Sequence, residues 1–334
     1  MNKKIAVVTL TWNDWKNTIE CLESIFNSSY NFFDVILVDN NSEKHHIDKI
    51  ILWANNKIEV KDEEFDFNPN KNLEIINVHK NHIIENTGQK KIFLIQNEEN
   101  LGLTAGLNVG YEFILEQDYD YIARIDCDFI ISKKYLEVMK TLFEQDSEIA
   151  AASPKIKHAY LRNTIWWAGL NIDWSYLKFQ KTMNLKKKRI QDHNSFEGVK
   201  ETDAICGCCS FYKKSALKTS GLGDEEFFLG PEDIELSFRL KKVGKILVNL
   251  NTYTFHKIAR SSEISGKFKR SYTDAVGFLL LIKKIGSFSD KFFGYSYFVI
   301  RIPIYYILKI FFKRDKNLVE GYIKGCKDFF LRKY

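Results

Sequence analysis

Two aspartates, Asp126 and Asp128, stand two positions apart directly after the apolar stretch 121–125. A turn at the end of a buried strand can aim both carboxylates at one point. Hard divalent cations prefer oxygen ligands, and Mg²⁺ is usually held by one or two carboxylates together with substrate phosphates. The pair therefore predicts a site for a metal and a diphosphate, although the same short sequence also occurs by chance in solvated turns.

A second pair of carboxylates, Glu232 and Asp233, opens a stretch with helical periodicity. Pro231 precedes the pair, and proline is favoured in the first turn of a helix. Acidic side chains at this position also complement the helix dipole. Spacing alone therefore leaves the choice between a structural and a catalytic role open.

The strands that would position these side chains are predicted at residues 5–10, 34–39, 92–96 and 121–125, with a helix over residues 14–26. This alternation is typical of an α/β fold. In open parallel sheets, ligands bind outside the carboxyl ends of the strands. The polar residues that follow the strands are therefore candidates for one site. Residues 55–91 are polar and weakly periodic, and we expect a surface insertion there.

These motifs, in their order along the chain, resemble those of the family 2 glycosyltransferases of the GT-A fold, including rhamnosyltransferase-like enzymes of bacterial polysaccharide synthesis. Residues 9–13 resemble the family's first-strand motif, residues 38–42 its nucleotide-base motif and residues 100–108 its loop-helix motif. Residues 126–128 are similar to its DxD, and residues 227–239 to the late motif that holds its acid-base pair. The resemblance covers roughly residues 3–260.

The resemblance implies an α/β fold of the GT-A type in residues 1–261, with a nucleotide-sugar-binding half in 1–130 and an acceptor-binding half in 131–261. A helical, aromatic and basic tail would occupy residues 262–334. The implied activity is inverting transfer from a nucleoside-diphosphate sugar, UDP- or dTDP-linked, to the hydroxyl of a saccharide or lipid-linked saccharide. The implied cofactor is Mg²⁺ or Mn²⁺.

The resemblance also implies roles for single residues. Asp233 would be the catalytic base, and Glu232 would bind or orient the acceptor. Asp128 would bind the metal directly, with Asp126 on the ribose or on the metal through water. His256, which follows a strand-like stretch, would complete the metal site, although a single histidine is more often an ordinary surface or core residue.

The base pocket would be lined by residues at the ends of the first two strands. These are Thr11, Asn13, Asp39 and Asn40, with Asn100 and Gly102 as further nucleotide-sugar contacts. A carboxylate accepts and cannot donate hydrogen bonds, so Asp39 would favour the imide N–H of uracil or thymine over cytosine.

Acceptor contacts are predicted at Trp166, Trp167 and Gly207. The tryptophans can stack on a sugar ring or can simply belong to the core, and Gly207 would let a substrate approach the backbone closely. Cys206, Gly207, Cys208 and Cys209 do not make a zinc motif, because no second pair of ligands follows at zinc-site spacing.

The composition of the chain further restricts the class of protein to which it can belong. The 334 residues are 45% hydrophobic and 28% charged with a net charge of +6, as expected for a globular protein with a substantial core. Six cysteines without a disulfide pattern, and no signal-peptide pattern, favour a cytoplasmic protein. No dinucleotide-binding glycine motif follows the first strand, which argues against a dehydrogenase. No RNA-binding signature is present, so nucleic acid is not expected as a partner.

The tail combines many aromatic residues with interleaved lysines and arginines, above all in residues 283–316. This composition favours peripheral contact with the inner face of the cell membrane. Arg301 and Pro303 argue against a full membrane span over 292–312. Packing of the same rings on the catalytic body or on a second subunit remains the alternative.

Two other functions stay open at this stage. A nucleotidyltransferase of the same fold class would need a basic N-terminal phosphate loop, which the sequence lacks. A non-catalytic sugar- or lipid-binding protein would not need Asp126, Asp128 and Asp233 together.

Overall fold

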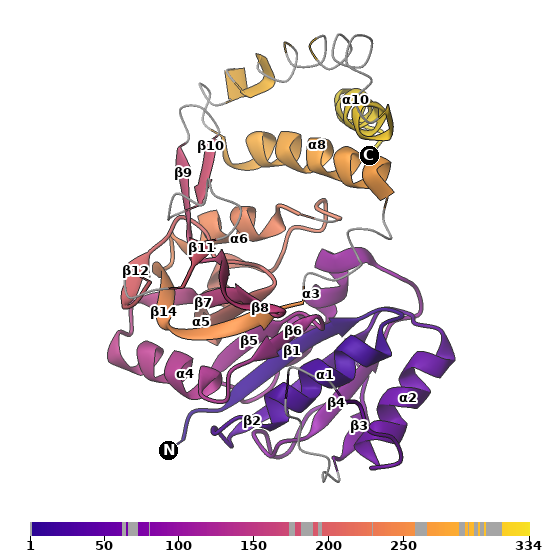
Figure 1. Cartoon of the computed structure of the whole chain (residues 1–334), viewed down its shortest axis with the longest axis vertical. Helices are drawn as coiled ribbons and strands as arrows, with labels where there is room; N and C mark the ends of the chain where they lie inside the picture. Colours follow the sequence, from indigo (N-terminus) through magenta and orange to yellow (C-terminus); the bar gives the residue numbers. More distant parts are fainter. Residues whose placement is uncertain are drawn as a thin grey trace.

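The computed structural model describes residues 2–61, 65, 73–79, 81–173, 178–181, 190–192, 196–228, 230–257, 266–286, 291–292, 294–296, 300, 304 and 316–334. Its body is a large sheet covered by helices on both faces, and two tail helices lie beyond helix α6 (Figure 1). The α/β fold predicted from the sequence is confirmed.

The N-terminal half of the sheet is parallel. Its strands lie in the order β5-β1-β2-β4-β3, and every pair among them is parallel. Their bounds are β1 (Ile5–Thr11), β2 (Phe33–Asp39), β3 (Ile75–Asn77), β4 (Ile92–Gln96) and β5 (Tyr121–Ile125). The strand order reverses at β1, between β2 on one side and β5 on the other, which is where ligands bind in open α/β sheets.

The second half of the sheet is mixed. Strand β13 (Cys209–Lys213) lies antiparallel between β5 and β7 (Ile149–His158), and β14 (Lys245–His256) runs parallel to β7. The remaining strands are β6 (Phe129–Ile131), β8 (Leu161–Trp167), β11 (Ile190–Gln191) and β12 (Val199–Glu201), with a separate pair β9 (Leu170–Asp173) and β10 (Lys178–Lys181). The sheet is therefore wholly parallel only in its N-terminal half.

Helices cover the two faces of the sheet in two sets. One face packs on α1 (Trp15–Phe26), α2 (Lys44–Ala54) and α4 (Tyr135–Gln145), and the other on α3 (Gly102–Leu115), α5 (Lys214–Ser220) and α6 (Glu232–Leu240). Strand β1 shows the alternation that makes this possible: Ile5 and Val7 enter one core, and Ala6 and Val8 the other. Both faces of the parallel strands are therefore buried.

Two glycines let α3 approach the sheet. A Cβ at Gly106 would lie 3.0 Å from Leu10, and one at Gly110 would lie 2.8 Å from Val8 and 2.9 Å from Val38. The spacing of Gly102, Gly106 and Gly110 by four residues thus marks a helix face. Close contact between α3 and the ends of β1 and β2 fixes the loop before α3 at the carboxyl edge of the sheet.

The tail packs on the body through a third hydrophobic cluster. Helix α8 (Gly266–Ile285) lies across α6, and α10 (Lys316–Phe330) crosses α8 (Figure 1). Phe227 and Ile234 of the body share this cluster with residues of both tail helices, Ala275, Leu279, Tyr322 and Phe329 among them. Among the residues that the structure describes, no helix is both long and apolar enough to cross a membrane.

The tail was predicted to contact a membrane, with packing on the body as the alternative. For the described parts of α8 and α10, packing on the body is what the structure contains. Most of the aromatic and basic residues between these helices, Arg301 and Pro303 included, lie outside the described residues. Residues 55–91, expected as a surface insertion, supply the edge strand β3.

Candidate active site

The carboxyl ends of β1, β2 and β5 bring together most of the residues predicted for the donor site. Thr11 and Asp39 are register partners at the ends of β1 and β2. Val8 of β1 is level with Arg124 of β5, so that Asp126 emerges at the same edge two residues later. The parallel register therefore gathers side chains that are more than 100 positions apart in the chain.

Asp39 is buried and partly engaged. Its carboxylate accepts hydrogen bonds from the backbone N–H of Ser42 at 3.0 Å and from the side-chain amide of Gln96 at 3.3 Å. A carboxylate offers about four lone-pair sites, so that Asp39 retains capacity for a further donor. Trp12, immediately after Thr11, is 52% exposed at the end of β1, where its ring can offer a stacking face to a planar base.

Asn40 has a structural role. Its amide nitrogen donates to the Asn100 side chain at 2.9 Å and to the Gly102 carbonyl at 3.0 Å. Its amide oxygen accepts from the side chain of Asn97 and the backbone N–H of Leu101, both at 3.1 Å. Asn40 thus ties the loop before α3 to the end of β2, a role that the prediction of direct nucleotide contact did not include.

Thr11 and Asn13 are engaged in the same neighbourhood. The Thr11 hydroxyl lies 2.7 Å from that of Thr18 on α1. The Asn13 backbone N–H donates to the Ser42 hydroxyl at 2.9 Å, and its side-chain oxygen accepts from the backbone of Glu43 at 2.8 Å. These bonds join the end of β1 to the turn after β2 and shape the edge of the predicted base pocket.

Arg124 links the two carboxylate motifs. The guanidinium donates to both oxygens of Asp126, from Nε at 3.1 Å and from Nη2 at 3.4 Å, while Nη1 lies 3.5 Å from Oε1 of Glu232. The Arg124 side chain is only 4% exposed. Burial raises the pKa of Asp126, and the positive charge of Arg124 acts in the opposite direction.

Asp128, which follows the end of β5, contacts His256 at the end of β14. Its Oδ2 atom lies 3.2 Å from Nε2 of His256. The imidazole stacks on Phe129, with ring centroids 4.5 Å apart, and meets the edge of Trp166 at the same distance. The aromatic contacts fix the ring, so that Asp128, His256 and Trp166 form one side of the site.

The fit of this pair to a divalent cation can be judged from its chemistry. Asp128 offers carboxylate oxygens and His256 an imidazole nitrogen, and both suit Mn²⁺, while Mg²⁺ favours the oxygens. Within the described ranges, no three His, Cys, Asp or Glu side chains are grouped closely enough to hold a metal by themselves. Two protein donors suit a cation that takes its other ligands from a diphosphate and water.

Asp233 stands at the start of α6 and faces the loop before β13. Its Oδ2 atom accepts from the backbone N–H of Gly207 at 3.0 Å, and its Oδ1 atom from the N–H of Ile234 at 2.9 Å. Burial, and next the negative charge of Glu232, raises the pKa of Asp233 to about 6. Such a carboxylate is ionised at neutral pH yet more basic than an ordinary aspartate.

Gly207 makes room for Asp233. A Cβ there would lie 2.9 Å from the Asp233 Cβ and 3.1 Å from Nη1 of Arg124. The glycine was predicted to admit a substrate, and in the structure the group that approaches its backbone is the Asp233 side chain. Any larger residue would displace the two charged groups on which the site depends.

The loop before α6 is held by three helices. From α3, the Thr104 hydroxyl donates to the Phe227 carbonyl at 2.6 Å, and the Asn108 amide to the Gly223 carbonyl at 2.9 Å. From α6, the guanidinium of Arg239 donates to three carbonyls of residues 220–222. From α8, Lys284 lies 2.7 Å from both Asp224 and Glu226. The position of the Glu232–Asp233 pair therefore depends on the tail as well as on the body.

Other predicted residues are placed as follows. Trp167 is 5% exposed and belongs to the main core, while Trp166 next to it is partly exposed beside His256. The Lys257 ammonium, next to His256, pairs with Glu20 of α1 inside the body.

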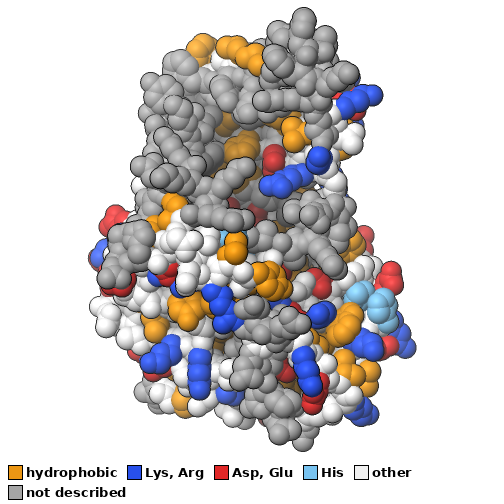
Figure 2. All heavy atoms as spheres, in the orientation of Figure 1, with side chains coloured by type: hydrophobic (Ala, Val, Ile, Leu, Met, Phe, Trp, Pro, Cys, Tyr) orange, Lys and Arg blue, Asp and Glu red, His pale blue; other side chains and the backbone are white. Residues whose placement is uncertain are grey.

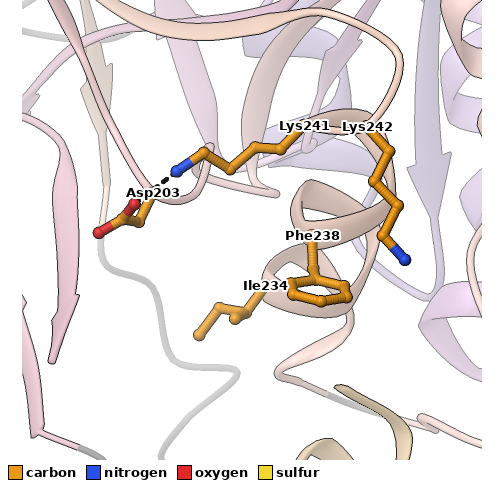
Figure 3. Close-up of a pocket in the computed structure, with 5 residues that line it drawn as sticks. All are labelled: Asp203, Ile234, Phe238, Lys241 and Lys242. Carbon is orange, nitrogen blue, oxygen red and sulfur yellow. Dashed lines mark hydrogen bonds and ion pairs between the residues drawn. The ribbon is translucent and has the colours of Figure 1, made fainter. Parts of the chain in front are cut away.

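A separate hollow opens on the outer side of α6. It has a volume of about 200 Å³ and is lined by Asp203, Ile234, Phe238, Lys241 and Lys242 (Figure 3). Asp203 and Lys241 are paired across its edge, and Lys242 lies over the Phe238 ring. The hollow contains none of the carboxylates of the two motifs.

Two residues of the site were missed by the sequence analysis. Arg124 was read as part of a strand, although a basic residue in a stretch otherwise expected to be buried is a signal for a paired, functional charge. Trp12 was included in a motif without a role. No local pattern pointed to the contact of α8 with the loop before α6.

The fold is that of the GT-A class. Among solved structures, the mannosyltransferase PcManGT from Pyrobaculum calidifontis, in complex with GDP-Man and Mn²⁺, has a TM-score of 0.57 at 12% identity, with 100% of this chain and 89% of that chain covered. S. aureus TarS 1-349 in complex with UDP-GlcNAc has a TM-score of 0.55 at 15% identity, with 98% and 80% covered.

GalNAc-T7 with UDP, GalNAc and Mn²⁺ has a TM-score of 0.52 at 16% identity; the match covers 76% of this chain but only 43% of that one. A search of curated proteins found no match. At such identities the structural likeness carries the fold alone. Residues 66–221 match the family model of Glycosyl transferase family 2. This match agrees with the family that the sequence motifs resemble.

Proposed function

We propose that this protein transfers a sugar, with inversion at the anomeric carbon, from a nucleoside-diphosphate sugar to an acceptor hydroxyl. The observation that carries the proposal is the bridge through Arg124, whose guanidinium contacts Asp126 of the first carboxylate motif and Glu232 of the second. A donor held at Asp126 would therefore lie next to the pair that contains the proposed base, Asp233.

The donor would bind along the carboxyl edge of β1, β2 and β5. Asp39 would accept the imide N–H of a uracil or thymine ring, and Trp12 would stack on the ring. Thr11, Asn13 and the loop of Asn100 and Gly102 would line the same pocket, with Asn40 holding that loop in place. The relatives of similar fold contain UDP-GlcNAc or GDP-Man, and the present chain is proposed to take a UDP- or dTDP-linked sugar because of Asp39.

Asp128 and His256 would hold the cation, with Asp126 near the ribose or contacting the cation through water. Two of the structural relatives contain Mn²⁺, and a carboxylate with an imidazole suits that ion. When bound, Mn²⁺ or Mg²⁺ would neutralise charge on the departing diphosphate as a Lewis acid.

Asp233 would act as the general base. Each of its oxygens accepts one backbone N–H and keeps a further lone pair for the acceptor hydroxyl. The hydroxyl proton passes to Asp233 as the acceptor oxygen bonds to the anomeric carbon. The bond from that carbon to the diphosphate oxygen breaks, and its electron pair leaves with the nucleoside diphosphate.

The acceptor would approach from the side of Trp166 and Glu232. Trp166 is partly exposed beside His256 and can stack on a saccharide ring, whereas the buried Trp167 is not part of this proposal. We further propose a saccharide or lipid-linked saccharide acceptor from cell-surface polysaccharide assembly, at the inner face of the membrane. The aromatic and basic composition of the tail supports that setting.

The test is a panel of nucleotide sugars, assayed for release of nucleoside diphosphate with Mn²⁺, with Mg²⁺ and with a chelator. We expect release with a uridine or thymidine diphosphate sugar that requires the cation and rises when an acceptor saccharide is added. Release from none of the donors in the presence of either cation, with acceptors from several saccharide classes, would reject the proposal.

A further inference from the structure

Arg124 is a charged side chain in the interior of the sheet. It occupies β5 between Ala123 and Ile125, both fully buried, and is itself only 4% exposed. Moving an unpaired charge out of water is costly, and even a paired one is often no more stable than an apolar residue of similar size. A need for stability alone does not explain an arginine at this position.

The contacts of Arg124 span the two halves of the domain. Its Nε and Nη2 atoms hold both oxygens of Asp126 at the end of β5, and Nη1 lies 3.5 Å from Glu232 at the start of α6. The same Nη1 atom would be 3.1 Å from a Cβ at Gly207, whose backbone N–H holds Asp233. One guanidinium therefore contacts Asp126 and Glu232 and adjoins Asp233.

We infer that Arg124 is a positioning residue that fixes the donor-side carboxylate Asp126 and the Glu232–Asp233 pair relative to one another. The planar guanidinium presents donors in a fixed fork, so that the direction of each contact is set as well as its length. This inference rests on the proposed function in one respect, the assignment of Asp233 as the base.

Arg124 also balances the charge around Asp233. The groups that face Asp233 are Glu232 from α6, Arg124 from β5 and the Tyr212 phenol from β13. Burial and Glu232 raise the pKa of Asp233, whereas the hydrogen bond from the Gly207 N–H and the charge of Arg124 lower it, and the result is a pKa of about 6. Without the positive charge, Asp233 would be protonated over more of the neutral range and would be unable to accept a proton.

Two substitutions separate the charge of Arg124 from its geometry. Arg124→Gln removes the charge, and we expect the acidic limb of the kcat–pH profile to move upward by about one pH unit or more. Arg124→Lys keeps the charge but not the fork, so the limb should stay in place while kcat falls by about tenfold or more. Tyr212→Phe is the matched control, because it removes a neutral polar group from the same surroundings, and its limb should not move.

A second readout does not depend on turnover. Titration of Asp233 by ¹³C NMR in the substrate-free protein should give a higher pKa in Arg124→Gln than in the wild type and no upward shift in Tyr212→Phe. If turnover survives Asp233→Asn, the assignment of the base fails while this titration still tests Arg124. An unshifted Asp233 titration in Arg124→Gln would overturn the inference. A wild-type kcat in Arg124→Lys would also overturn it, and this measurement can be made even if Arg124→Gln does not fold.

Discussion

Helix α8 packs tightly on the loop before α6 at Gly277. A Cβ added there would lie 2.4 Å from the Gly230 carbonyl oxygen and 2.7 Å from Cδ of Pro231. Both atoms belong to the segment directly before Glu232 and Asp233, and neither is the far end of a flexible side chain. The substitution Gly277→Ala therefore requires α8 or this segment to move.

The size of the effect follows from these distances. Ordinary contact between heavy atoms needs about 3.5 Å, so the added methyl group overlaps the loop by roughly 1 Å. Overpacking of this kind costs about 1–3 kcal/mol, against a gain of about 0.5–1 kcal/mol for replacing a glycine within a helix. We expect a net loss of about 1 kcal/mol or more and a fall in Tm of a few degrees.

Activity should suffer more than stability. A misplacement of about 1 Å at a reacting group can cost on the order of 10²-fold in rate, and Asp233 follows Pro231 by two residues. Gly277→Ala should therefore lower kcat by about 10- to 100-fold. The Kd for the nucleotide should stay within a factor of about two, because the proposed donor pocket lies at the ends of β1, β2 and β5 and not in the loop before α6.

The assay combines thermal unfolding, nucleotide binding by calorimetry and steady-state turnover. Thr273→Ala is the matched control, because it places the same residue in the same helix at a side chain that bonds only to carbonyls of its own helix. A Gly277→Ala protein with the Tm and kcat of the Thr273→Ala control would show that the tail does not position the loop before α6.

Further predictions concern the remaining parts of the site. Asp128→Asn should abolish cation-dependent turnover with little change in Tm, and turnover that still responds to Mn²⁺ would contradict the metal assignment. Asp39→Asn should reduce the preference for uridine over cytidine diphosphate, measured as the ratio of their Kd values. Lys284→Met removes a cation 2.7 Å from two carboxylates and should cost about 1 kcal/mol of unfolding free energy, whereas Lys283→Met should change little. Because the pKa of Asp233 is raised to about 6, kcat should rise with pH through that value and fall about tenfold per unit below it. The same raised pKa means that the contribution of Asp233 to stability is present below about pH 4 and is lost as the pH rises through about 6, which thermal unfolding across that range can check.

The parallel half of the sheet could be predicted because the sequence patterns that indicate its strands are local. Buried parallel strands appear as short runs of β-branched residues, and the predicted strands correspond to β1, β2, β4 and β5. The glycines of α3 are spaced by four residues, which indicates a helix face, and Gly106 and Gly110 lie against the ends of β1 and β2. In each case the pattern that forms the element is contained in the element itself.

The second, mixed half of the sheet was less predictable, because its interactions join segments that are distant in the chain. Gly207 is adjacent in space to Asp233, 26 residues later. No sequence pattern indicates that the glycine serves another side chain rather than a substrate. Trp166 and Trp167 could not be told apart without the bulged pairing of β7 with β8 that places one in the core. Asn40 likewise bonds to a loop 60 residues away.

The role of the tail is the clearest example of information that only the fold supplies. Its composition predicted contact with something anionic and partly apolar. In the structure, the Lys284 ammonium lies between Asp224 and Glu226 of the loop before α6. The apolar side of α8 packs against Phe227 and Ile234. The visible face of the molecule in Figure 2 carries dispersed charges of both signs on the body below the tail. A membrane contact by the tail remains a prediction, testable by sedimentation of the protein with anionic and neutral vesicles.

The central claim is that Asp233 takes the proton from the acceptor while the donor is held at the ends of β1, β2 and β5. The most direct measurement compares the wild type with Asp233→Asn, using a donor that the wild type turns over. We predict a fall in kcat of about 10²-fold or more and a Kd for the nucleoside diphosphate within about twofold of the wild type. Turnover within a few-fold of the wild type would contradict the account and would leave Glu232 or another residue as the base.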